Sequence, residues 1–157
     1  MYKTKLNIYL AGPLFSEAEI QKRKEHAFVI KNMFQHKYDV SLYNPVELNE
    51  TVKDLKNKPN IFFYENDIDF IKKTNLMIVD IDNLDSGTMI ELGYFTALKE
   101  INKSESKYIF IYDSDWRNHL NRSARMNKFL DGLISTHCIY VKSSRELFEK
   151  LKEVYKL

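Results

Sequence analysis

Short apolar runs alternate with longer segments of helical periodicity along this whole 157-residue chain. The runs expected to form strands are Asn7–Ala11, Asp39–Tyr43, Leu76–Ile81, Tyr108–Tyr112 and Cys138–Val141. The segments expected to form helices are Ser16–Gln35, Phe62–Lys73, Thr88–Leu98, Ser123–Ile134 and Ser143–Tyr155. Such alternation is typical of parallel strands joined by right-handed helical crossovers. We therefore predict an α/β fold with a doubly wound, five-stranded parallel sheet flanked by helices.

The run Leu76–Ile81 is the clearest central strand, because it is nearly all apolar and rich in β-branched residues. The length, with 44% hydrophobic and 29% charged residues, suits a single globular domain over residues 1–157. The polar stretch Leu48–Asn60 is expected to be a loop that can include a turn of helix, and it is long enough to cover a site.

Charge and composition argue against a nucleic-acid partner and against a membrane or secreted location. Basic and acidic residues number 24 and 22, and clusters such as Lys22–Lys24 are expected on solvated helix faces. Without a basic stripe, we expect no nucleic-acid partner. No apolar run is long enough to span a membrane, and the first residues lack the apolar core of a signal peptide. With the lone Cys138, these features favour a cytoplasmic location.

Several common chemistries are also disfavoured. The four histidines and the single cysteine show no metal-ligand spacing, so we expect no metal site. Ala11-Gly12-Pro13 is too short for a phosphate-binding loop, and Pro13 lacks a donor N–H. No serine lies in a nucleophile-elbow motif. We therefore expect no cofactor.

Ligands of such sheets bind beyond the carboxyl ends of the strands, which directs attention to the segment after Leu76–Ile81. Asp85 lies in the following turn, and Gly87 permits a close backbone approach. Glu91 falls about one turn into the next helix, where the helix dipole favours an ionised carboxylate that could serve as a nucleophile or base. The alternative is that Asp85 is a helix cap and Glu91 an ordinary charge near a helix start.

Two other strand-end regions carry candidate residues. Asp67 is one of three acids in Glu65–Asp69, which point apart on a helix, so one can reach a cleft while the others are solvated. Tyr9 could direct its hydroxyl at a ligand from the first strand, and Phe15 could stack on a flat ligand. Both aromatic residues could equally serve in packing.

Three segments together resemble the nucleoside 2-deoxyribosyltransferase family. They are Ile8–Glu19, the stretch from Asn66-Asp67 through Asp85–Tyr94 and, more weakly, Met126-Asn127. The resemblance covers most of the chain in order and implies a flavodoxin-like sheet. It also implies a pentosyltransferase that moves 2-deoxyribose between purine or pyrimidine bases in nucleotide salvage. The reaction would pass through a covalent glycosyl-glutamate with net retention.

The resemblance implies four catalytic roles. Glu91 would be the nucleophile that attacks C1′ of the deoxyribose, and Tyr9 would orient its carboxylate. Asp67 and Asp85 would bind the base, and one of them would protonate the departing nitrogen. Which of the two acids carries the proton stays open, because coupled acids can share it.

The resemblance also implies a substrate-binding set made of Phe15, Gly12, Gly87 and Asn127. Asn127 would come from a neighbouring subunit and hold the sugar hydroxyls. A homo-oligomer, from dimer to hexamer, is therefore expected, with a 2′-deoxynucleoside and a free nucleobase as its small-molecule substrates.

Some family features do not match. Ser16 stands where some members have an acid, and the chain end Tyr155–Leu157 does not match a terminal carboxylate used in the site. The main alternative is a 2′-deoxynucleoside 5′-monophosphate N-glycosidase of the same fold, although the apolar turn Gly12–Phe15 suits a phosphate poorly. A further alternative is a nucleoside-sensing domain in which Glu91 is structural. Base preference stays open.

Overall fold

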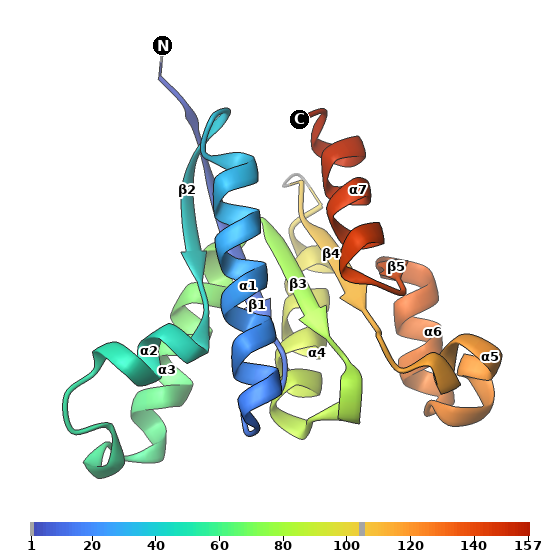
Figure 1. The fold of residues 1–157 in the computed structure, drawn as a ribbon, viewed down its shortest axis with the longest axis horizontal. Coiled ribbons are helices and arrows are strands. Elements are labelled where there is room, and N and C mark those ends of the chain that lie inside the picture. Colours follow the sequence, from blue (N-terminus) through green and yellow to red (C-terminus); the bar gives the residue numbers. More distant parts are fainter. Residues whose placement is uncertain (1, 104–105) are drawn as a thin grey trace.

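A computed structural model describes residues 2–103 and 106–157, and it shows a fully parallel sheet. The strands of this described part are β1 (Thr4–Ala11), β2 (Tyr38–Tyr43), β3 (Leu76–Asp80), β4 (Tyr108–Tyr112) and β5 (Ile139–Val141). Their order is β2-β1-β3-β4-β5 (Figure 1). Strand β2 lies on one side of β1, and β3, β4 and β5 follow in turn on the other side. This is the flavodoxin-like order, and it confirms the predicted fold class.

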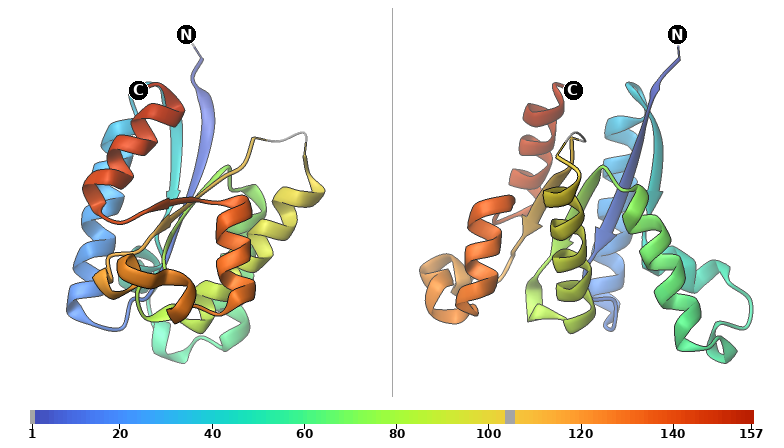
Figure 2. Two further views of the ribbon diagram at one scale, coloured as in Figure 1. Left: turned by 90° about the vertical axis from the view of Figure 1, so that its right-hand side faces the viewer. Right: turned by 180° about the vertical axis from the view of Figure 1, so that it is seen from behind.

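Helices cover both faces of the sheet (Figure 2). One face carries α1 (Glu17–Phe34) and α7 (Ser144–Tyr155). The other carries α3 (Asn60–Lys73), α4 (Ser86–Ile101) and α6 (Lys128–His137). Each face has its own buried hydrophobic cluster, which explains why the strands are apolar on both sides. None of the helices in the described ranges is long and apolar enough to cross a membrane.

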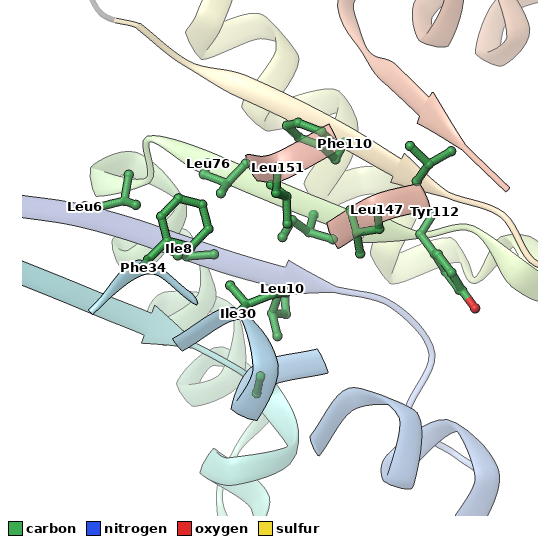
Figure 3. Close-up of a cluster of buried hydrophobic side chains, with 13 residues drawn as sticks. Leu6, Ile8, Leu10, Ile30, Phe34, Leu76, Phe110, Tyr112, Leu147 and Leu151 are labelled. Atoms are coloured by element: carbon green, nitrogen blue, oxygen red, sulfur yellow. The ribbon is translucent and has the colours of Figure 1, made fainter. Parts of the chain in front are cut away.

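Strand β1 shows how the sheet directs side chains to one face or the other. Leu6, Ile8 and Leu10 point toward α1 and α7, where they join the cluster drawn in Figure 3. The alternate residues Tyr9 and Ala11 point toward α3 and α4, because side chains of a strand alternate between its faces. The register of β1 therefore places the Tyr9 phenol on the face that carries α3 and α4.

The predicted helix starts are well supported. Ser16 caps α1, and Glu19 completes a capping box by accepting hydrogen bonds from the Ser16 and Phe15 backbone N–H groups. Ser143 caps α7 in the same way, by accepting from the N–H of Glu146.

The stretch Leu48–Asn60 was expected to be a loop that can include a turn of helix, and the structure shows two short helical segments in it. Helix α2 (Pro45–Thr51) begins just before it, with Asn44 as its cap and Pro45 in its first turn. A short 3₁₀ turn, η1 (Leu55–Asn57), follows. Proline in the first turn of a helix needs no N–H partner, so Asn44-Pro45 starts a helix as well as ending a strand.

The single helix expected over Ser123–Ile134 is also wrong. Two helices occupy this region, α5 (Trp116–Arg125) and α6 (Lys128–His137). Asn127 adopts a non-helical conformation between them, and its side chain accepts a hydrogen bond from the N–H of Phe129. The capping amide therefore starts a new helix inside a sequence whose apolar spacing looks continuous.

Candidate active site

A phenol and a carboxylate from distant parts of the chain meet at the carboxyl edge of the sheet. Tyr9 lies near the end of β1 and is fully buried. Its Oη donates a hydrogen bond of 2.9 Å to Oε1 of Glu91 on α4. Tyr9 and Glu91 are 82 positions apart in the chain, and the structure brings them together as the family resemblance implied.

Glu91 lies beyond the first turn of α4, away from the free N–H groups at the start of that helix. Burial raises the pKa of Glu91 to about 7, with further increases from the charges of Asp67 and Asp85. The hydrogen bond from Tyr9 opposes this rise. Desolvation, and not the helix dipole considered in the sequence analysis, is therefore the largest influence on this carboxyl group.

The N-terminal groups of α4 are instead capped by Asp85. Its Oδ2 accepts hydrogen bonds of 2.8 Å from both the N–H and the Oγ1 hydroxyl of Thr88. The simple reading of Asp85 as a helix cap is confirmed. Its carboxylate also lies close enough to Glu91 to influence that residue's pKa.

Asp67 is the acid of its cluster that reaches the site. It is half-buried on α3, whereas Glu65 and Asp69 are exposed, as the helical spacing predicts. Its Oδ1 accepts a hydrogen bond of 2.6 Å from Oη of Tyr43. Burial raises the pKa of Asp67, and the phenols of Tyr43 and Tyr9 limit the rise because they stabilise the ionised form.

Tyr43 is a site residue that the sequence analysis missed. It ends β2 directly opposite Tyr9 on β1, and the two rings stack with centroids 5.2 Å apart. Its other side packs on Phe70, with centroids 4.7 Å apart. The available signal was a second strand-end tyrosine at the same level of the predicted sheet, but it was read only as part of an apolar run.

The carboxylates Asp67 and Glu91 line a cavity of about 330 Å³ between α3 and α4. The other lining residues are Tyr64, Ile68, Ile71, Gly87, Ile90 and Tyr94. A mainly apolar cavity of this size with a few convergent polar groups is typical of a site for a small organic ligand. Gly87 is thus placed at the cavity, as expected.

Three predicted binding residues do not line this cavity within one described chain. Phe15 is 77% exposed on the turn after β1. Asn127 is exposed, and its side chain is engaged in capping α6. Gly12 has a φ of 153°, and a Cβ there would lie 2.7 Å from Cβ of Asp80. Its local role is therefore to allow this close approach.

Arg23 corrects a second expectation, since it was assigned to a solvated face but is only 1% exposed. Its Nη1 donates to the carbonyl of Ala11 at 2.6 Å, and its Nη2 donates to Oδ2 of Asp80 at 3.0 Å. Lys22 reaches both Asp80 and Asp82 at 2.9 Å. These ion pairs join α1 to the ends of β1 and β3.

Residues 2–103 and 106–157 contain no group of three or more His, Cys, Asp or Glu side chains arranged to hold a metal ion. The polar groups that converge on the cavity are carboxylates and phenols. Carboxylates in an apolar cavity, each joined to a phenol, can act as nucleophile, acid or base without further groups.

A cavity of this kind, beside the β1–β3 switch point of a parallel sheet, is typical of a small-molecule site in a flavodoxin-like fold. Residues 8–151 match the family described as nucleoside 2-deoxyribosyltransferase, and the chain belongs to this family. Members of the family are enzymes that act on N-glycosidic bonds.

Similar proteins are found both by sequence and by fold. A protein of Ureaplasma parvum, described as uncharacterized, is 48% identical over 150 residues and covers 94% of both chains. The fold matches a conserved protein of Enterococcus faecalis with a TM-score of 0.73, 23% identity and 97% and 99% of the chains covered. A 2-deoxyribosyltransferase of Bacillus psychrosaccharolyticus matches with a TM-score of 0.65 at 19% identity. The match covers 92% of this chain and 90% of that chain.

A CMP N-glycosidase of Clostridium botulinum shares the fold as well. Its TM-score is 0.57 at 15% identity, with 96% of this chain and 99% of that chain covered. At such low identity, the solved structures establish the fold alone. The fold therefore occurs both in a 2-deoxyribosyltransferase and in an N-glycosidase.

Proposed function

We propose that this protein is a nucleoside 2-deoxyribosyltransferase, which moves 2-deoxyribose from one nucleobase to another. The observation that carries the proposal is the 2.9 Å hydrogen bond from the buried Tyr9 to Glu91, which lines a cavity together with Asp67. This arrangement supplies an oriented nucleophile beside a second carboxyl group that can carry a proton.

In the first half-reaction, Glu91 attacks C1′ of the bound 2′-deoxynucleoside. The C1′–N bond breaks, its electron pair stays on the base nitrogen, and a carboxyl group protonates the base. Developing positive charge at C1′ is stabilised by the nearby carboxylate, which then forms an ester with the sugar. The Tyr9 phenol leaves one oxygen of Glu91 directed at the sugar.

In the second half-reaction, an incoming base attacks C1′ from the face that the first base left. The ester bond breaks, Glu91 leaves as a carboxylate, and the proton lost by the incoming base returns to the acid. Two inversions give net retention, as in retaining glycosidases. Water can replace the base, so slow hydrolysis is expected when no acceptor base is present.

Asp67 suits the proton-donor role better than Asp85. Burial raises the pKa of Asp67, which favours its protonated form. Asp85 does not line the cavity, and its Oδ2 already accepts two hydrogen bonds from Thr88. We therefore assign proton transfer to Asp67.

The charge of the site supports a nucleoside over a nucleoside monophosphate. A helix N-terminus is a natural phosphate site, but at α4 the carboxylate of Asp85 already occupies the free N–H group of Thr88. Asp85 and the nucleophilic carboxylate of Glu91 carry negative charge nearby, so a 5′-phosphate would be repelled. Arg23 is committed to Asp80 and to the Ala11 carbonyl.

We also propose that the enzyme is a cytoplasmic homo-oligomer in which Asn127 of a neighbouring copy holds the sugar hydroxyls. In one chain Asn127 lies outside the cavity, which supports a contribution across an interface. Ile90, which lines the cavity, is 71% exposed, and Phe129 beside Asn127 is 81% exposed. Association would bury both apolar side chains.

The test is an exchange assay with 2′-deoxyinosine and free adenine. We expect 2′-deoxyadenosine and hypoxanthine in equal amounts, and we expect Glu91→Ala to abolish both products. Free deoxyribose phosphate formed only from 2′-deoxyinosine 5′-monophosphate would show the N-glycosidase instead. Binding of nucleoside without turnover, unchanged in Glu91→Ala, would show a sensing domain.

A further inference from the structure

We propose that Tyr43 is a positioning residue for proton transfer, acting through Asp67. The inference rests on the proposed function and extends it to a residue outside the expected catalytic set. In this view, Tyr43 holds one carboxyl oxygen of Asp67 so that the other oxygen delivers its proton to the departing base.

The sheet itself places Tyr43 beside the catalytic pair. Tyr43 and Tyr9 are register partners on β2 and β1, so their side chains leave the same face of the sheet at the same level. The two rings stack at 23°, and Tyr43 also stacks on Phe70 of α3 at 27°. Packing on both sides fixes the ring, which leaves the hydroxyl little freedom.

Each cavity carboxylate has its own phenol. Tyr9 donates to Glu91 at 2.9 Å, and Tyr43 donates to Oδ1 of Asp67 at 2.6 Å. Burial raises the pKa of both phenols, so they stay protonated at neutral pH and act only as donors. A donor that is always protonated can orient a carboxyl group without competing for the transferred proton.

This hydrogen bond dictates which oxygen of Asp67 carries the proton. Because Oδ1 accepts from Tyr43, the acidic proton lies on Oδ2. When C1′–N breaks, Oδ2 gives its proton to the base nitrogen, and Asp67 becomes a carboxylate stabilised by the Tyr43 hydroxyl. When the acceptor base enters, its N–H proton returns to Oδ2. Tyr43 therefore stabilises the form of Asp67 that exists after proton transfer.

The other groups around Asp67 set the background against which Tyr43 acts. Tyr9 on β1 stabilises the ionised form of Asp67, and Glu91 on α4 is an acid whose pKa responds to the charge of Asp67. Asp85, at the start of α4, influences Glu91 in the same direction. Loss of the Tyr43 hydroxyl removes a donor to the ionised form, so it raises the pKa of Asp67.

The chain offers a matched control in β5. Tyr140 donates a hydrogen bond to Oδ2 of Asp113 at 2.6 Å, the same length and chemistry as the bond from Tyr43 to Asp67. Neither residue lines the cavity. Tyr140→Phe therefore removes an equivalent bond elsewhere on the sheet and reports the purely structural consequence.

The experiment compares Tyr43→Phe and Tyr140→Phe on two donors without an acceptor base, and it measures the single-turnover rate at which the donor base is released. This isolates the first half-reaction. One donor is 2′-deoxyinosine, whose base must be protonated to leave. The other is 7-methyl-2′-deoxyguanosine, whose base is already cationic and leaves without a proton. We expect Tyr43→Phe to lower the release rate from 2′-deoxyinosine by roughly 10- to 100-fold and to leave the rate from the 7-methyl donor nearly unchanged. Tyr140→Phe should change neither rate.

A pH profile gives a second readout. Tyr43→Phe should move the alkaline limb on 2′-deoxyinosine to higher pH, because Asp67 then holds its proton more tightly. Equal losses on both donors, or an unchanged rate and limb, would overturn the role of Tyr43. Wild-type protein that exchanges neither donor would instead overturn the proposed function, so the two failures are distinguishable.

Discussion

Two groups of carboxylates lie at the same edge of the sheet but on opposite faces. The cavity carboxylates, Asp67 and Glu91, face α3 and α4 and are joined to phenols. The ion-pair cluster, made of Lys22, Arg23, Asp80 and Asp82, faces α1 and pairs each acid with a cation. The carboxylates of both groups are at least partly buried. The two groups therefore differ mainly in the kind of side chain that partners each carboxylate.

The two groups differ in how their partners affect the pKa of the carboxyl groups. Burial opposes ionisation of Asp82, but hydrogen bonds from Ser114 and Lys22 hold its pKa below the usual range. Burial raises the pKa of Glu91 to about 7, because a phenol compensates for desolvation less than a cation does. Cation partners therefore fix charges that join elements, and phenol partners leave carboxyl groups able to exchange protons.

The largest effect is expected from Glu91→Gln. The amide can still accept from Tyr9, but it cannot attack C1′, so exchange should fall by roughly 10⁴-fold or more. Steady-state assays with 2′-deoxyinosine and adenine measure this. Asp82→Asn is the matched change in the ion-pair cluster and should keep exchange near the wild-type rate. A slow Asp82→Asn beside an active Glu91→Gln would reverse the assignment of the two groups.

Next in size is the stability cost of Arg23→Met. It leaves Lys22 as the remaining cation beside the buried Asp80, so the cost should be at most that of a broken buried ion pair, about 3–5 kcal/mol. Urea unfolding at pH 7 measures the change. Adding Asp80→Leu should recover most of the loss, because the buried charge disappears. A double variant as unstable as the single one would show that packing, and not charge pairing, dominates here.

The pH dependence of stability should have opposite signs in the two groups. Glu91 holds a proton in the folded state up to about pH 7, whereas its ordinary pKa is 4.5. Its contribution to stability therefore falls as pH rises from 4.5 to 7, by on the order of 3 kcal/mol. Glu91→Gln should equal wild type in stability below this window and exceed it above.

Asp82→Asn should show the reverse. The pKa of Asp82 is lowered in the folded state, so its contribution is present at neutral pH and is lost as pH falls through that lowered pKa. The variant should be less stable than wild type at pH 7, and the gap should close on acidification. Urea midpoints across the pH range test both variants, and slopes of the same sign would contradict the comparison.

The smallest of these effects is expected from Tyr9→Phe. Removing a hydrogen bond to a charged group costs about 1.5–3 kcal/mol, which corresponds to roughly 10- to 100-fold in kcat/KM. The pKa of Glu91 should rise further, so the acid limb of the kcat/KM profile should move to higher pH. A profile that only drops in height would mean that Tyr9 does not set the ionisation of Glu91.

Much of the fold was predictable, because periodicity depends on local sequence. The alternation of strands and helices gave the parallel sheet, and the Ser16 capping box was recognisable from its spacing. The break at Asn127 was not predictable from apolar spacing, because Ser123–Ile134, which includes the end of α5 and most of α6, read as one helical pattern. One capping amide decided where the second helix begins.

The site was also predictable only in part. The meeting of Tyr9, Glu91 and Asp67 was expected only from the family resemblance, and the structure brings all three together. Arg23 and Tyr43 were missed, because their importance depends on partners from distant elements. Arg23 lies in a charged run that is typical of a solvated helix face. It is buried because its guanidinium binds Asp80 at the end of β3 and the carbonyl of Ala11 at the end of β1.

The central claim is that the Glu91 carboxylate bonds to the anomeric carbon. The most direct measurement is intact-mass spectrometry, followed by peptide mapping, of protein that is acid-quenched during turnover of 2′-deoxyinosine without acceptor base. We predict a mass increase of one deoxyribosyl group, located at Glu91 and absent from Glu91→Gln. Full exchange activity without such an adduct, or an adduct on another residue, would contradict it.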